Sequence, residues 1–332
     1  MQNIALLGAG FIGHVHAKSL ATNPRVEFTY VYDTDESRAR ELAAAYGASF
    51  APLEEILASD RVGAVLIATS TNTHAELIEA AAQAGKAVFC EKPIDLSYEV
   101  AERAATTARE AGVPVMIDFC RRFDPAYASL KKAVEKGEIG DIELIQMSTR
   151  GPSLPPISYL ASSGGQMRDQ NIYFFDLLCW ITGLEPVSVY AEGSALVDPE
   201  VAEVGDVDTS IAILRMSNGA LCQIDAQRRI AYGYDERIEI SGTKEMMEAG
   251  RQQTGWTKRY GQGSVTSEGL DAGWFERIEH TFAPALDEFV GALEEGREPS
   301  AGLADGLRAQ RIADAATESL QTGLPVTISY DA

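Results

Sequence analysis

The first 120 residues alternate short apolar runs with longer stretches in which apolar positions recur every three or four residues. The strand-like runs lie at 3–8, 26–33, 63–69, 87–91 and 113–118, and the helix-like stretches at 35–47, 73–85 and 97–112. Continuous apolar strands alternating with amphipathic helices are typical of a parallel sheet covered on both faces. The pattern therefore predicts an α/β domain with a doubly wound parallel sheet over residues 1–120. The spacing of Thr73 and Glu76 predicts a capping box at one helix start.

After about residue 120 the pattern changes. Four strand-like runs follow one another without helices between them, at 186–194, 207–217, 219–229 and 234–243. Asn218 and Gly219 separate two of these runs, and Asn-Gly in that setting is a strong signal for a β-hairpin. Residues 121–332 are therefore predicted to form a second α/β domain with a large, mostly antiparallel open sheet and helices on one face. A last helix at 304–323 can pack back on the first domain.

Length and composition narrow the class of protein. A chain of 332 residues is long enough for two domains, and 45% hydrophobic with 23% charged residues is ordinary for a globular protein. The net charge of −21 argues against nucleic acid or an anionic membrane surface as a partner. The sequence has no apolar run of membrane-spanning length and no basic leader followed by an apolar stretch, so a cytoplasmic protein is predicted.

Candidate metal ligands are few in this sequence. Four cysteines stand far apart inside apolar runs, without the spacing of a zinc site: Cys90, Cys120, Cys179 and Cys222. His14, His16 and His280 have no partner at metal-ligand spacing along the chain. We therefore expect buried free thiols, structural histidines and no metal site.

The segment "GAGFIG" (Gly8, Gly10, Phe11, Ile12 and Gly13) follows the first predicted strand and opens the first predicted helix. In a dinucleotide-binding loop the first glycine permits a tight turn, the second lets the backbone approach a pyrophosphate, and the third lets helix and strand pack closely. The helix N-terminus then offers amide donors to the phosphates. The context favours a Rossmann dinucleotide site over the alternative, a glycine-rich turn without a ligand.

Asp33 follows Gly13 by 20 residues, at the end of the second predicted strand. An acid at this place accepts hydrogen bonds from the ribose hydroxyls and repels a 2′-phosphate. The nearest base is Arg38, so NAD is predicted in preference to NADP. Asp33 is also able to cap the next helix, and the two roles are compatible.

Five stretches together resemble the Gfo/Idh/MocA oxidoreductases, and within them the bacterial inositol 2-dehydrogenases. They are 8–17, 68–94 with its "EKP" tripeptide, 121–127, 162–169 and 228–242. The resemblance runs from residue 3 to about residue 320, and "EKP" behind a dinucleotide fingerprint is much more specific than the fingerprint alone. It implies a Rossmann domain, a second domain whose open sheet mediates dimers or tetramers, and hydride transfer between NAD(P) and a hydroxyl-bearing carbon of a sugar or cyclitol.

The resemblance also implies roles for particular residues. Lys92 of "EKP" is expected to reach the reacting hydroxyl, and Asp169 to help hold that lysine or the substrate. Cofactor contacts are implied for the loop and strand-end residues Thr69, Asn72, His74, Glu91 and Lys92. The position of Lys92 supports this independently, because ligands of open α/β sheets bind at the carboxyl ends of parallel strands. An ammonium group there stabilises an alkoxide as charge develops.

The sequence departs from the inositol dehydrogenase pattern at several polar positions. Tyr173 and Phe174 stand where histidine and aspartate are usual, Cys120 replaces an amide, and Gly151 replaces an acid. A site built to hydrogen-bond hydroxyl groups discriminates through such residues, so the substrate need not be myo-inositol.

Asp169 and Tyr173 stand four residues apart in a predicted helix and should share one face of it. Tyr173 is then either a core tyrosine or the general base, because some members of the superfamily carry a tyrosine in place of the catalytic histidine. A phenol is a weak base near its ordinary pKa of about 10, but a neighbouring ammonium such as Lys92 favours phenolate. Arg122 and Tyr234 are candidates for lining the substrate pocket, and the alternatives are a structural ion pair and a core aromatic.

Three functions remain open at this level. The first is an NAD-dependent cyclitol or sugar dehydrogenase in which Tyr173 removes the hydroxyl proton. The second is a sugar-sensing regulator of the same fold without catalysis, against which the presence of Lys92 and Asp169 argues. The third is a sugar–sugar oxidoreductase that keeps its cofactor tightly bound.

Overall fold

The computed structural model describes residues 1–330, which divide into two compact units. The first unit comprises Met1–Phe123 and His280–Gln310, and the second comprises Asp124–Glu279 and the chain from Arg311 onward. Helices α11 (Trp274–Glu295) and α12 (Leu303–Thr322) therefore each contribute to both units. The sequence pattern assigned all of 121–332 to a second domain, and its indication of a return to the first was limited to the helix at 304–323.

The first unit is built on a six-stranded, wholly parallel sheet in the order β3-β2-β1-β4-β5-β6. Its strands are β1 (Gln2–Leu7), β2 (Val26–Tyr32), β3 (Ser49–Phe50), β4 (Ala64–Ile67), β5 (Ala87–Glu91) and β6 (Val115–Asp118). Every residue of β4, β5 and β6 is buried, as expected for strands covered on both faces. The five predicted strands are confirmed, and this strand order is that of a Rossmann fold.

Helices and short 3-10 turns connect these strands. They are α1 (Phe11–Thr22), α2 (Glu36–Tyr46), α3 (Leu53–Ala58), η1 (Thr71–Thr73), α4 (His74–Gln83), α5 (Tyr98–Ala111) and η2 (Cys120–Phe123). The predicted capping box at α4 is wrong. The Thr73 hydroxyl lies 2.8 Å from the Ser70 carbonyl oxygen and 2.7 Å from the Thr69 hydroxyl, and no side-chain cap forms. A side-chain cap does form at α2, where Asp35, not Asp33, accepts from the Ser37 and Arg38 amides.

Helix α11 was not predicted, although its apolar spacing is regular. The apolar residues of this helix follow one another at helical spacing, and each is at most 2% exposed: Phe282, Leu286, Phe289 and Val290. Pro284 lies inside the helix, and an internal proline ordinarily indicates a helix boundary. The packing of this apolar stripe in the first unit outweighs that local signal.

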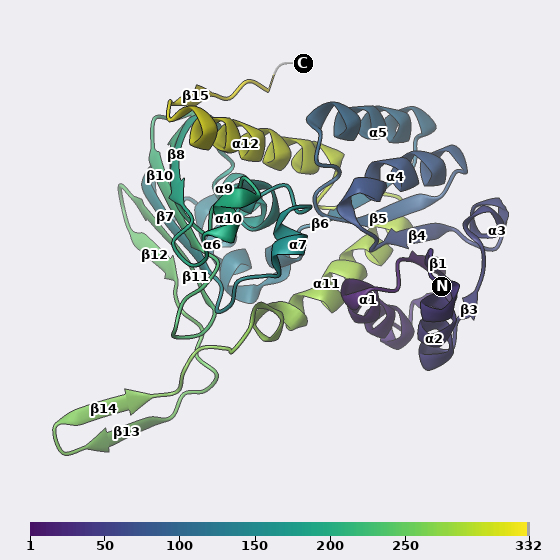
Figure 1. Cartoon of the computed structure of the whole chain (residues 1–332), viewed down its shortest axis with the longest axis horizontal. Helices are drawn as coiled ribbons and strands as arrows, with labels where there is room; N and C mark the ends of the chain where they lie inside the picture. Colours follow the sequence, from purple (N-terminus) through teal and green to yellow (C-terminus); the bar gives the residue numbers. More distant parts are fainter. Residues whose placement is uncertain (331–332) are drawn as a thin grey trace. The chain divides into compact units, whose positions relative to one another are not determined.

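The second unit contains a seven-stranded sheet in the order β12-β11-β7-β10-β9-β8-β15. Figure 1 draws most of this sheet in teal and green. Within residues 1–330, β7 and β10 are the one parallel pair of this sheet, so the predicted mostly antiparallel sheet is confirmed. Its strands are β7 (Ile142–Arg150), β8 (Pro186–Ser194), β9 (Thr209–Met216), β10 (Leu221–Gln227), β11 (Asp235–Gly242), β12 (Met246–Ala249) and β15 (Val326–Thr327). The predicted hairpin joins β9 to β10, and Gly219 takes a φ of +93° at its turn.

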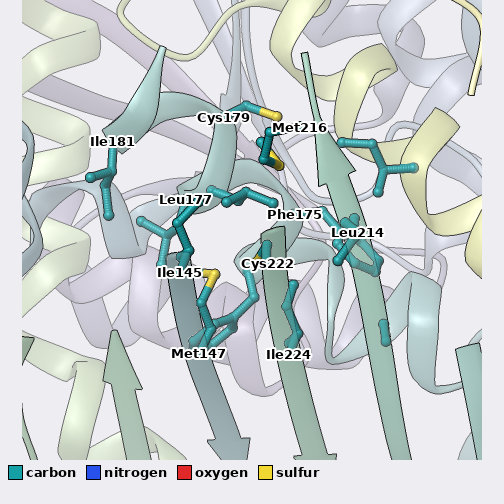
Figure 2. Packing of buried hydrophobic residues seen from close by; sticks show 14 of the residues in the cluster. Ile145, Met147, Phe175, Leu177, Cys179, Ile181, Leu214, Met216, Cys222 and Ile224 are labelled. Atoms are coloured by element: carbon teal, nitrogen blue, oxygen red, sulfur yellow. The ribbon is translucent and has the colours of Figure 1, made fainter. Parts of the chain in front are cut away.

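One face of this sheet packs on the helix α9 (Ile172–Thr182) and on part of α12. Figure 2 shows Ile145, Leu214 and Ile224 from three neighbouring strands beside Phe175 of α9. Residues of the opposite face alternate with these and remain exposed, among them Ile211 and Ile213. Helices therefore cover one face of the sheet, as predicted.

The remaining elements of the second unit are short. They are α6 (Pro125–Glu135), α7 (Ile157–Leu160), α8 (Gln166–Asp169), α10 (Glu200–Glu203) and a separate hairpin of β13 (Lys258–Gly261) and β14 (Ser264–Ser267). All four cysteines are buried thiols, as predicted. Among the helices of residues 1–330, none combines the length and the apolar character needed to cross a bilayer.

Candidate active site

The loop from β1 to α1 has the shape that a dinucleotide phosphate requires. Gly8 takes a φ of +108°, and a Cβ there would lie 2.4 Å from the Ala68 carbonyl oxygen. A Cβ at Gly13 would lie 2.1 Å from the Gly8 carbonyl oxygen, so both glycines are needed for close packing. A Cβ at Gly10 would meet nothing within 4 Å, and no side chain caps α1. Open space in front of an uncapped helix N-terminus is where a pyrophosphate binds. Phe11 and Ile12 form the first turn behind it.

Asp33 lies directly after β2 and ties the glycine loop to the start of α2. Its Oδ2 accepts a hydrogen bond of 2.7 Å from the Ala9 amide, and its Oδ1 accepts from the Asp35 amide at 2.8 Å. Arg38 donates to the same Oδ1 at 3.0 Å. Burial alone raises the pKa of Asp33, but the two amide hydrogen bonds and the Arg38 charge outweigh it, so the pKa is lowered. The Asp33 carboxylate is therefore ionised, and it contacts Arg38, the nearest basic residue in the sequence.

The loop after β4 holds the next predicted cofactor residues. Thr69 is partly buried and Asn72 is exposed on η1. His74 is different, because its side chain is buried and its ring nitrogens lie 2.8 Å from the Pro93 carbonyl oxygen and 3.1 Å from that of Thr69. Burial lowers the pKa of His74, so the ring is held neutral. His74 therefore links two strand-end loops from inside, and its cofactor contact stays a prediction.

The "EKP" segment ends strand β5 and begins the turn after it. Glu91 is buried, and its Oε1 lies 2.9 Å from Nε2 of His16 on α1, while its cofactor contact stays a prediction. Lys92 is partly exposed, and the peptide bond that joins it to Pro93 is cis. His16 has no partner at metal-ligand spacing along the chain, but the structure brings two acids to it, since Asp118 Oδ2 lies 3.5 Å from the nitrogen that contacts Glu91.

In the second unit, Asp169 stands at the centre of a polar cluster that the sequence did not reveal. Its Oδ1 accepts a 2.8 Å hydrogen bond from the Tyr159 hydroxyl, and its Oδ2 accepts one of 2.9 Å from the Arg228 guanidinium. Arg228 is buried and also pairs with Asp206 at 3.1 Å. A buried arginine with two carboxylates fixes the Asp169 side chain in one orientation. The signal was the pair Arg228–Arg229 at the end of a predicted strand, and only the tertiary structure connects Arg228 to Asp169.

Asp169 and Tyr173 do not belong to one continuous helix, which corrects the prediction. Asp169 ends α8, Tyr173 is the second residue of α9, and Gln170 and Asn171 lie between them with right-handed helical backbone angles. The Asn171 amide donates to the carbonyl oxygen of Gln166, five residues back, where the regular ladder is interrupted. Tyr173 is partly buried and packs against the hydrophobic core of the second unit.

Arg122 and Tyr234, the two weaker candidates for the substrate pocket, make contacts of a structural kind. Arg122 is 3% exposed, and its guanidinium donates to the Ser300 carbonyl oxygen at 2.5 Å and pairs with Asp305 at 3.1 Å. Tyr234 is 6% exposed, and its hydroxyl donates to Glu236 at 2.8 Å. These contacts fit a buried ion pair and a core aromatic, and the pocket-lining role of both residues stays a prediction.

Together, the parallel sheet order, the glycine loop and Asp33 define a dinucleotide-dependent oxidoreductase with a second, sheet-based unit. Comparison with known proteins agrees. The family model described as oxidoreductase family, NAD-binding Rossmann fold, matches residues 2–119. The GFO/IDH/MocA C-terminal domain model matches residues 127–248. The chain belongs to the GFO/IDH/MocA family of oxidoreductases.

Similar proteins cover the chain almost end to end. An inositol 2-dehydrogenase of Rhizobium meliloti is 37% identical over 324 residues, which is 98% of both chains. A crystal structure of a myo-inositol dehydrogenase from Corynebacterium glutamicum matches with a TM-score of 0.94 and 34% identity over 100% of both chains. That of a scyllo-inositol dehydrogenase from Lactobacillus casei, with bound NAD(H) and scyllo-inositol, matches at 0.90 and 26% identity over 98% of this chain and 99% of that one.

Proposed function

We propose that this protein is an NAD-dependent dehydrogenase that oxidises a secondary hydroxyl group of a cyclitol or a closely related sugar. The observation that carries the proposal is 37% identity over 98% of both chains to an inositol 2-dehydrogenase. The solved structure of a relative with NAD(H) and scyllo-inositol supports the same substrate class. The polar cluster around Asp169 suits a hydroxylated substrate, since it presents charged hydrogen-bonding groups.

The residues of the first unit fit the cofactor. Gly8, Gly10 and Gly13 leave the space that a pyrophosphate needs at the start of α1, and Asp33 places an ionised carboxylate where the ribose is held. Bound NAD supplies the acceptor for the hydride that leaves the substrate carbon. The exposed Asn72 and the partly buried Thr69 complete the proposed contacts.

The chain's own residues then handle the proton. In alcohol oxidation the hydroxyl loses a proton as the carbon loses a hydride, and Tyr173 is proposed as the base that takes this proton. The Lys92 ammonium stabilises the negative charge that develops on the substrate oxygen. Asp169, held by Tyr159 and Arg228, orients the substrate through its carboxylate.

A panel of inositols and sugars, assayed by nicotinamide absorbance with added NAD, tests the proposal. The expected result is reduction of NAD with at least one cyclitol or sugar. Binding of the same compounds without turnover would instead indicate a sensor. Nicotinamide absorbance that purifies with the protein and responds to a second sugar would indicate a sugar–sugar oxidoreductase.

Cofactor choice gives a first prediction. The wild type should prefer NAD, and Asp33→Ala should shift the ratio of kcat/KM values toward NADP by roughly tenfold to a hundredfold, because a charged contact is worth about 1.5–3 kcal/mol. The loss of Asp33 also frees the Arg38 donor that it holds at 3.0 Å. Kinetics with both cofactors measure the shift. Asp35→Ala is the matched control, since Asp35 contacts Arg38 and caps α2 but makes no bond to the glycine loop. A wild type that prefers NADP would contradict the assignment.

Association of copies of this chain is a further part of the proposal. The outer face of the second sheet exposes a group of apolar side chains, each 40–50% exposed: Leu144, Ile211, Ile213 and Leu221. Contiguous apolar groups on a sheet face mark interaction sites. We expect a homodimer or homotetramer by light scattering, and Ile213→Asp should shift it toward the monomer.

A further inference from the structure

Three titratable side chains meet inside the first unit, at the carboxyl ends of two neighbouring strands. His16 comes from α1, Glu91 is the last residue of β5, and Asp118 is the last residue of β6. Glu91 and Asp118 are register partners, so their side chains start side by side. His16 Nε2 lies 2.9 Å from Glu91 Oε1 and 3.5 Å from Asp118 Oδ2.

This cluster is shielded from water. The side chains of His16 and Asp118 are each 1% exposed, and that of Glu91 is 11% exposed. The His16 ring also meets the rings of Phe89 and Phe282 edge-on, with centroids 5.7 and 5.5 Å away. Two ionised carboxylates in such surroundings are strongly disfavoured unless charge or hydrogen bonds compensate them.

The available hydrogen bonds do not compensate two charges. Among the described residues, the one bond of the cluster with an N–H donor joins His16 Nε2 to Glu91. No such donor in residues 1–330 reaches either oxygen of Asp118, whose carboxyl group instead interacts with that of Glu91. A carboxylic acid needs less solvation than a carboxylate and can donate to its ionised neighbour. Burial and the adjacent Glu91 raise the pKa of Asp118 well above its usual range. Burial is the largest influence on Glu91 too, but the hydrogen bond from His16 and the nearby positive charges, that of Lys92 among them, together outweigh it and lower the pKa of Glu91.

Other charged and titratable groups also face the pair of carboxyls, from β5, from the turns after β5 and β6, and from α4. They are Lys92, Arg121, His74 and the thiols of Cys90 and Cys120. Lys92 and Arg121 favour ionised carboxylates, whereas burial opposes ionisation. One proton held between the two carboxyls satisfies both tendencies.

We propose that His16, Glu91 and Asp118 form a buried, proton-sharing triad that positions Lys92 relative to the cofactor-binding helix α1. His16 lies one turn after Gly13 on that helix, and Glu91 directly precedes Lys92. A bond between His16 and Glu91 therefore couples the phosphate-binding element to the turn that carries the proposed catalytic lysine. The three act as positioning residues, and this role rests on the function proposed for Lys92.

The proton itself is testable without any activity. Because the pKa of Asp118 is raised on folding, the folded chain keeps a proton that the unfolded chain releases above pH about 4. The free energy of unfolding should therefore fall as pH rises from there toward the raised value. Asp118→Asn mimics the protonated acid and removes this dependence, so its Tm should exceed that of the wild type by roughly 2–4 °C at mildly alkaline pH. A Tm–pH slope unchanged by the substitution overturns the shared proton.

The positioning role is tested by turnover with the substrate found in the panel. Glu91→Gln should lower kcat by roughly tenfold to a hundredfold, because small misplacement of a catalytic group has effects of that size, while KM for NAD changes little. Asp118→Asn should keep wild-type kcat, and Asp118→Val should lose it. Thr29→Val is the control, since it removes another buried hydrogen bond of the unit, from Thr29 to the Ile4 carbonyl oxygen.

Equal kcat in Glu91→Gln and Thr29→Val would overturn the positioning role. The ligand atoms of the triad also lie within 4.8 Å of one another, close enough to share a cation. Metal analysis of the purified protein should find no stoichiometric divalent ion. A bound ion that Asp118→Asn removes would overturn the proton-sharing triad. If no substrate is oxidised by any variant, the proposed function fails while the Tm–pH measurement still decides the triad.

Discussion

Lys92→Ala is expected to lower turnover by about a hundredfold or more while NAD affinity stays nearly unchanged. The ammonium lies in the turn after β5, at the edge of a parallel sheet where ligands of this architecture bind. Removing one preorganised charge that stabilises a developing alkoxide has an effect of this size. Cofactor binding should survive, because the glycine loop and Asp33 hold the dinucleotide without this side chain.

The measurement is kcat together with the dissociation constant for NAD on the same preparation. Lys86→Ala is a matched control, because Lys86 directly precedes the opposite end of β5 and donates to the Ser59 carbonyl oxygen at 2.7 Å. Its loss should lower stability and leave turnover per folded molecule unchanged. Near-normal turnover of Lys92→Ala would remove Lys92 from the mechanism.

The parts of the first unit that the sequence predicted depend on local patterns. Strands buried on both faces appear as short apolar runs, and the glycine loop is a short motif whose positions each have a steric reason. The Asn218–Gly219 hairpin was predictable for the same reason, since the turn chemistry and the two strands are adjacent in sequence.

What the sequence did not show depends on contacts between distant segments. His16 and Glu91 are 75 residues apart, and their bond exists only because α1 packs beside the carboxyl end of β5. The relation of Asp118 to Glu91 follows from the pairing of β5 with β6, which the Rossmann strand order implies once it is known. Arg228 likewise meets Asp169 across 59 residues. The family resemblance identified Glu91 and Asp169 as site residues but did not show which way their side chains face.

The structure also indicates which departures from the inositol dehydrogenase pattern are able to change substrate recognition. Of the departures from the inositol dehydrogenase pattern, Cys120 and Phe174 are completely buried, so they replace polar groups with core packing. The backbone of Gly151 donates a hydrogen bond to the Gln227 carbonyl oxygen and accepts one from the Ile230 amide. A Cβ at Gly151 would come within 3.2 Å of the Arg228 carbonyl oxygen. Tyr173 is only partly buried, so among these four positions it is the one best able to alter recognition and catalysis together.

Tyr173→Phe separates the two roles that the sequence left open for this residue. If Tyr173 is the base, the variant keeps the ring and its packing on the core but loses the ionisable hydroxyl. It should fold, bind NAD and lose roughly two to four powers of ten in turnover, and the rise of activity with pH should flatten. Tyr173→His should recover part of the activity, because an imidazole also accepts a proton near neutral pH.

The core-tyrosine alternative predicts lower stability with turnover per folded molecule unchanged, since an unpaired buried partner is the main consequence. Tyr127→Phe provides the reference for that outcome, because Tyr127 is a fully buried tyrosine of the same unit whose hydroxyl donates to Glu236 at 3.3 Å. Tm and kcat measured on both variants show whether Tyr173 is the general base or a core tyrosine. A Tyr173→Phe protein that behaves like Tyr127→Phe, destabilised yet fully active, would mean that the proton leaves through another group. Asp169, held between Tyr159 and Arg228, would then be the next residue to test.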